Sequence, residues 1–201
     1  MAIIPIVRTI LASLVLAASL AGCGALTAQN PNSALKPVNA VPDEQSANGL
    51  MLKGADVVAY WTMQKYVQGK VDISSNYEGV SFRFSSAEHK ALFDKEPKKY
   101  LPEYNGYCAN GIVYGIPWGG DADSFKMING KLYMFGGEGS RDGWDIDVPR
   151  NLALAEKYWA EEVKGSNSFF QRMKRLTFRV PHYRSGSELA QDVAAAKAKK
   201  S

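Results

Sequence analysis

Two side chains in the middle of this 201-residue chain, Cys108 and His89, have the chemistry of metal ligands or of a reactive site. Soft and borderline metal ions accept thiolate and imidazole, so the pair could hold Cu(I), or Zn²⁺ with further ligands such as Asp or water. An imidazolium beside the thiol would instead make Cys108 reactive. The two positions are 19 residues apart, a spacing that is compatible with a shared site but does not require one.

Both residues also have an ordinary structural interpretation. Free Cys is among the most buried residue types in proteins, so Cys108 could be an inert core thiol. His89 is followed by Leu92 and Phe93 at helical spacing, which predicts that it faces the core with them. The cellular compartment of the protein helps to distinguish an inert Cys108 from a metal-binding or reactive one.

The first 22 residues have the composition of an export signal, not of a transmembrane helix. Arg8 supplies one positive charge, and the apolar run over residues 10–20 is too short to span a bilayer permanently. The segment ends in Leu-Ala-Gly-Cys at residues 20–23, which resembles the lipobox of bacterial lipoproteins. An ordinary signal peptide with an incidental Cys is the alternative.

The lipobox resemblance implies that Cys23 is acylated, palmitate being one of the expected chains, and becomes the first residue of the mature protein. Gly24 follows it in place of the Asp that retains lipoproteins at the inner membrane, which favours an outer-membrane anchor facing the periplasm. A lipidated Cys23 cannot pair with Cys108. A lone thiol in an oxidising compartment must be shielded, metal-bound or meant to react.

Composition divides the rest of the chain into three parts. Residues 23–48 contain three prolines among Asn, Ser, Ala and Gln, which predicts a lipidated Cys followed by a flexible tether. Residues 49–163 are rich in aromatic side chains and Gly-containing turns, as expected of one small globular domain. Residues 164–201 carry a net charge of +7 against +4 for the whole chain. Because the protein is expected to be exported, this basic extension does not indicate nucleic acid as a partner.

The basic extension begins with apolar residues at near-helical spacing, Phe169, Phe170, Met173 and Leu176, placed among Arg and Lys. One interpretation is an amphipathic segment that lies on an anionic surface. The other is a helix that packs its aromatic stripe on the domain and is followed by a solvated end, because such a stripe is usually core.

Short hairpins and capped helices are the elements expected to position Cys108 and His89. Apolar and polar residues alternate on both sides of Glu78-Gly79, which predicts a hairpin. Asn129-Gly130 predicts a second hairpin in which Ile128 pairs with Lys131. Ser86 is expected to cap the helix that carries His89, and Asp56 to cap an earlier one.

The segment over residues 77–93, which reads YEGVSFRFSSAEHKALF, resembles the YHS domain family. The resemblance covers roughly residues 50–163, and Asn-Gly-Tyr-Cys-Ala at 105–109 is similar to the exported subgroup, some of whose members carry selenocysteine in place of Cys108. Metal-binding members have two thiolates where this chain has Ser85 and His89. A hydroxyl is a poor ligand for such ions, so only His89 remains as a donor from that pair.

These observations predict an α+β fold, a single small domain of antiparallel hairpins and short helices. The leading functional interpretation is a non-catalytic periplasmic protein, anchored to the membrane by lipid, that binds copper or zinc through His89 and Cys108. A thiol redox protein that uses Cys108 is the second interpretation. A structural or partner-binding lipoprotein without chemistry is the third.

Overall fold

The computed structural model describes residues 33–43 and 45–199. The predicted leader and the lipidation site Cys23 lie outside the described residues. The strands are β1 Ala40–Asp43, β2 Ser46–Met51, β3 Lys70–Tyr77, β4 Val80–Phe84, β5 Asp121–Ile128 and β6 Lys131–Phe135. The helices are η1 Leu52–Gly54, α2 Ala59–Thr62, α3 Ala87–Lys95, α4 Pro97–Tyr100, η2 Glu103–Gly106, α5 Ala109–Ile112, α6 Glu138–Trp144, α7 Val148–Tyr158, η3 Trp159–Val163, α8 Ser168–Thr177 and α9 Gly186–Ala198. The predicted α+β class is confirmed.

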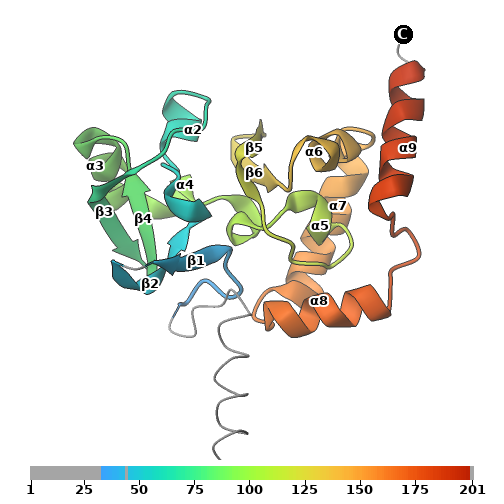
Figure 1. Ribbon diagram of the computed structural model, residues 1–201, viewed down its shortest axis with the longest axis horizontal. Helices are drawn as coiled ribbons and strands as arrows, with labels where there is room; N and C mark the ends of the chain where they lie inside the picture. The colour runs from blue at the N-terminus through green and yellow to red at the C-terminus, as the bar shows by residue number, and fades with distance from the viewer. Residues whose placement is uncertain (1–32, 44, 200–201) are drawn as a thin grey trace, which may run out of the picture.

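The larger sheet has the strand order β1-β2-β4-β3. The hairpin expected around Glu78-Gly79 is its β3–β4 pair, in which Tyr77 lies opposite Val80. β2 runs parallel to β4, with Gly49 opposite Val80, so the sheet is mixed and not made of antiparallel hairpins alone. Figure 1 shows this sheet with α3 and α4 beside it on one side of the molecule.

The predicted tether is wrong over its described part, because the fold begins well before residue 49. Val38 and Ala40 are buried, and β1 pairs with β2 in an antiparallel arrangement. The Asn39 amide donates to the carbonyls of Gly106 and Gly120, at 2.8 and 3.1 Å. A polar residue in a segment with linker composition thus forms hydrogen bonds with backbone carbonyls far away in the sequence. Composition alone does not predict such partners.

The second hairpin, β5–β6, has the predicted register, with Ile128 opposite Lys131 and Met127 opposite Leu132. Leu132 and Met134 belong to a hydrophobic cluster shared with the larger sheet. Tyr133 and Phe135 point to the other face and belong to a second cluster with α5, α6 and α7. The hairpin therefore separates two cores within the single small domain.

The basic extension continues the fold as two helices, α8 and α9, which lie on the side of the molecule away from the larger sheet (Figure 1). The interpretation of its aromatic stripe as core is wrong, because Phe170 is 69% exposed and Met173 is 50% exposed. None of the helices in the described part of the chain is long and apolar enough to cross a membrane.

Candidate functional site

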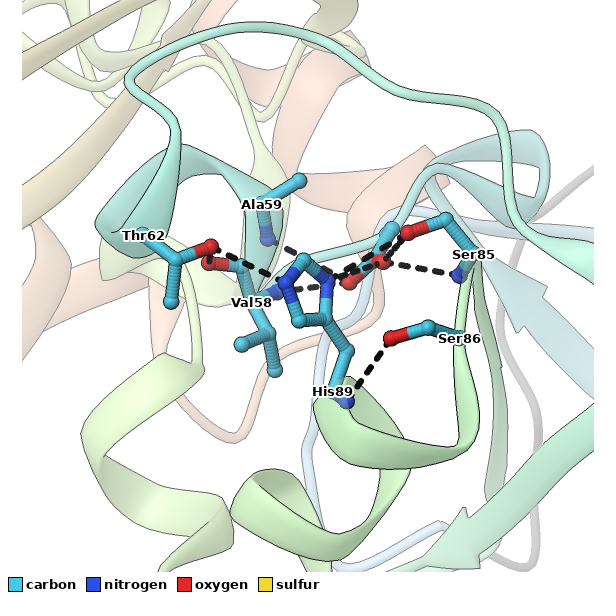
Figure 2. Close-up of polar contacts among 7 residues, drawn as sticks. Val58, Ala59, Thr62, Ser85, Ser86 and His89 are labelled. Carbon is cyan, nitrogen blue, oxygen red and sulfur yellow. Dashed lines mark hydrogen bonds and ion pairs between the residues drawn. The ribbon is translucent and has the colours of Figure 1, made fainter.

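His89 lies on the first turn of α3, whose predicted cap is confirmed because Ser86 Oγ accepts a hydrogen bond from the His89 amide at 3.1 Å. Its imidazole is buried, with 9% of the residue exposed. Nδ1 lies 2.6 Å from Asp56 Oδ2, and Nε2 lies 3.1 Å from Thr62 Oγ1 (Figure 2). Both ring nitrogens therefore already have protein partners.

Asp56 is fully buried and collects hydrogen bonds from three separate elements. Oδ1 accepts from the amides of Val58 and Ala59, at 3.0 and 3.3 Å, in the turn that leads into α2. The N-cap residue of α2 is Val58 and not Asp56 as predicted. Oδ2 accepts from the Ser85 amide at 2.8 Å and from its hydroxyl at 2.6 Å, and it faces the His89 imidazole. This arrangement fastens α2, the end of β4 and α3 together, as a structural junction does.

Cys108 immediately precedes α5 in the other half of the domain. Its backbone amide donates to the Trp118 carbonyl at 2.8 Å, and its Sγ lies 3.0 Å from Ser140 Oγ on α6. The residue is only 3% exposed and is not part of a disulfide in the described part of the chain.

The structure does not bring His89 and Cys108 together. α3 packs into the first hydrophobic cluster through Phe93, whereas Tyr107 and Ala109, on either side of Cys108, belong to the second. Figure 1 shows α3 and α5 in separate parts of the domain. Within the described ranges, no three His, Cys, Asp or Glu side chains are grouped so as to hold a metal ion.

A cavity of about 640 Å³ lies beside Cys108, and we call it the Cys108 cavity. The polar side chains of Asn110, Asp121, Ser140 and Arg184 line it together with several glycines. Leu189 and other small or apolar residues of α9 form a second wall. The volume is within the range of small-molecule binding sites, and so is the mixture of an apolar wall with a few polar groups.

The sequence analysis missed three polar residues of this cavity, Asn110, Ser140 and Arg184. Asn110 is 5% exposed, and its side chain lines the Cys108 cavity. Its only signal in the sequence is that it lies two residues after Cys108.

No family model matches this chain, and no curated protein or solved structure matches it either. The resemblance to the YHS family therefore stays a prediction, and the residues themselves carry the functional argument.

Proposed function

We propose that this chain is a lipoprotein anchored through Cys23 to the bacterial outer membrane and facing the periplasm, and that its Cys108 cavity binds a small thiol or disulfide compound. The observation that carries the proposal is the placement of the Cys108 thiol and the Asn110 side chain on the wall of one cavity. His89 has no part in this site, because both of its ring nitrogens are used by Asp56 and Thr62.

The chemistry is thiol–disulfide exchange. The Cys108 thiolate attacks one sulfur of a small disulfide, a mixed disulfide forms on Cys108, and the other half of the reagent leaves as a thiolate. The Ser140 hydroxyl, 3.0 Å from the sulfur, can donate a hydrogen bond to the thiolate. The Asn110 amide offers a donor and an acceptor to the bound compound.

Cystine tests the proposal as a small disulfide probe. The native chain should form one mixed disulfide at Cys108, detected by mass spectrometry, and Cys108→Ser should form none. Asn110→Ala should slow the reaction roughly tenfold, the equivalent of one lost hydrogen bond. The exposed Asn76 provides the matched control, since Asn76→Ala should leave the rate unchanged. A thiol that reacts only after denaturation would contradict the proposal.

Copper and zinc remain proposed ligands of the same thiol. Because the two predicted donors lie apart, any metal taken up on reconstitution with Cu(I) or Zn²⁺ should be lost in Cys108→Ser and kept in His89→Ala. Metal analysis after gel filtration measures this, with circular dichroism to show that both variants are folded. Loss of metal in a folded His89→Ala would contradict the assignment of the site to Cys108.

The lipid anchor gives a separate prediction. Cys23→Ser should abolish incorporation of labelled palmitate and leave the protein at its precursor size, because the acylated residue and the processing point coincide. Cys108→Ser is the matched control and should keep the label. Label that persists in Cys23→Ser would place acylation elsewhere.

A further inference from the structure

α8 packs on the domain with its polar face. Ser168 and Gln171, one turn apart, are buried, whereas Phe170 and Met173 are 69% and 50% exposed. Residues three and four positions apart share a face of a helix, so the apolar and polar sides are clearly separated here. The apolar side points away from the protein, which is the reverse of the usual arrangement in a globular domain.

Specific hydrogen bonds hold α8 in this orientation. Gln171 Nε2 donates to the Gly115 carbonyl at 2.9 Å, and Arg172 Nη2 donates to the Pro117 carbonyl at 3.1 Å. Arg175 Nε donates to Glu162 Oε2 at 2.9 Å. These bonds join α8 to the loop after α5 and to η3, so the outward direction of its apolar side is fixed.

The negative charge of Glu162, which faces the polar side of α8, is balanced by basic side chains of that helix. Burial acts to raise the pKa of Glu162, but hydrogen bonds from Arg175, Gln171 and Lys174 outweigh it and lower the pKa below its usual value. Glu162 is therefore ionised and committed to these partners.

The outward side of α8 combines exposed apolar residues with a basic surround. Phe170, Met173, Leu176 and Phe178 are 69, 50, 37 and 71% exposed, and we call them the α8 face. Six basic residues and no acidic residue occur over residues 164–184, and three of the six are paired: Lys174 and Arg175 with Glu162, and Arg184 with Asp192. Lys164 and Arg179 are exposed and form no ion pair within the described residues. Apolar side chains amid Lys and Arg are typical of a helix that lies in the interface of an anionic bilayer.

The α8 face also lies close to where the chain approaches its expected anchor. The Gly165 amide, just before α8, donates to the Lys36 carbonyl at 2.9 Å, and Figure 1 shows the start of α8 beside the segment that leads into β1. The described chain begins at Ser33, whose hydroxyl donates to the Glu78 carbonyl at 2.7 Å, and Ser33 is 10 residues from Cys23. Ten residues span at most about 35 Å, so an anchored membrane would be within reach of the face.

From these observations we infer that the α8 face docks on an anionic phospholipid bilayer. The apolar side chains enter the interface, and the exposed basic residues Lys164 and Arg179 contact lipid phosphates. The domain then lies against the membrane, in place of the free rotation that a flexible tether would allow. This inference does not depend on the chemistry of the Cys108 cavity.

Vesicle sedimentation tests the inference on the mature chain without its lipid, residues 24–201, which includes every residue that the structure describes. The probes are vesicles of phosphatidylglycerol with phosphatidylethanolamine, and vesicles of phosphatidylcholine alone. We expect binding to the anionic vesicles that weakens as salt is raised, and at least tenfold weaker binding to phosphatidylcholine.

Paired variants assign the binding to the α8 face. Phe170→Ser combined with Phe178→Ser should weaken binding to the anionic vesicles at least tenfold, because two large apolar side chains are lost from the interface. Met173→Ser should weaken it several-fold. Met63→Ser is its matched control, since Met63 is a 46% exposed methionine outside the α8 face, and it should change nothing.

Other results would overturn the inference. One such result is that the parent chain does not bind anionic vesicles. The other is that all of these variants bind as tightly as the parent chain and unfold at the same temperature. Sedimentation velocity tests the alternative that the α8 face binds a second copy of the chain. A dimer that Met173→Ser dissociates and Met63→Ser does not, without vesicle binding, would assign the face to self-association.

Discussion

Replacing Asp56 with Ala is expected to lower the free energy of unfolding by about 3–5 kcal/mol, the largest effect of any single substitution proposed for this chain. The carboxylate is fully buried, and both of its oxygens accept hydrogen bonds. Its removal leaves the amides of Val58 and Ser85 without that acceptor and separates the His89 imidazole from its charged partner. Urea unfolding followed by circular dichroism measures the loss.

Asp94→Ala is the matched control for Asp56→Ala. Asp94 also pairs with a basic side chain and a serine hydroxyl, Lys90 and Ser75, but its side chain is 45% exposed. Exposed pairs of this kind contribute little, so the control should lose less than about 1 kcal/mol. A similar loss in both variants would show that Asp56 does not have the role of a junction between α2, β4 and α3.

The sequence predicts those parts of this structure that depend on neighbours along the chain. The Asn129-Gly130 turn determines the register of β5–β6, so that Ile128 meets Lys131 as expected. Ser86 caps α3 because its hydroxyl reaches an amide three residues ahead. In each case the residues that decide the structure lie within a few positions of one another.

The sequence does not predict which elements meet. Helical spacing separates the two sides of α8, but it does not indicate which side contacts the domain, and here the partners of Gln171 and Arg175 decide the orientation. Asn39 lies in a segment with linker composition, and the sequence does not indicate that its side-chain amide donates hydrogen bonds to the distant carbonyls of Gly106 and Gly120. The proposed pairing of His89 with Cys108 failed for the same reason, because the β5–β6 hairpin separates their cores.

The second large effect concerns α9, which forms one wall of the Cys108 cavity. Leu189 packs so closely on Gly143 of α6 that a Cβ on Gly143 would lie 2.6 Å from Leu189 Cδ1. The ion pair between Lys197 and Asp142, which also joins α9 to α6, is exposed and adds little. No residue of α9 is buried, so the contact of Leu189 with α6 is the main apolar attachment of the helix.

Leu189→Asp should therefore detach α9 and expose Cys108. The substitution removes the apolar contact with Gly143, and the new carboxylate would lose its hydration if it stayed there. We expect the Cys108 thiol to react at least tenfold faster with a bulky maleimide reagent. The melting temperature of the domain should change by only a few degrees, because the two hydrophobic clusters contain no residue of α9. Stopped-flow labelling and calorimetry measure the two effects.

Ala195→Asp separates the role of the contact from the role of the charge. It places the same carboxylate on α9 at an exposed position, so it should leave both the labelling rate and the melting temperature unchanged. If Leu189→Asp labels no faster than Ala195→Asp, the route to Cys108 does not pass beneath α9. Faster labelling in Leu189→Asp alone would make the C-terminal helix the element that controls access to the thiol.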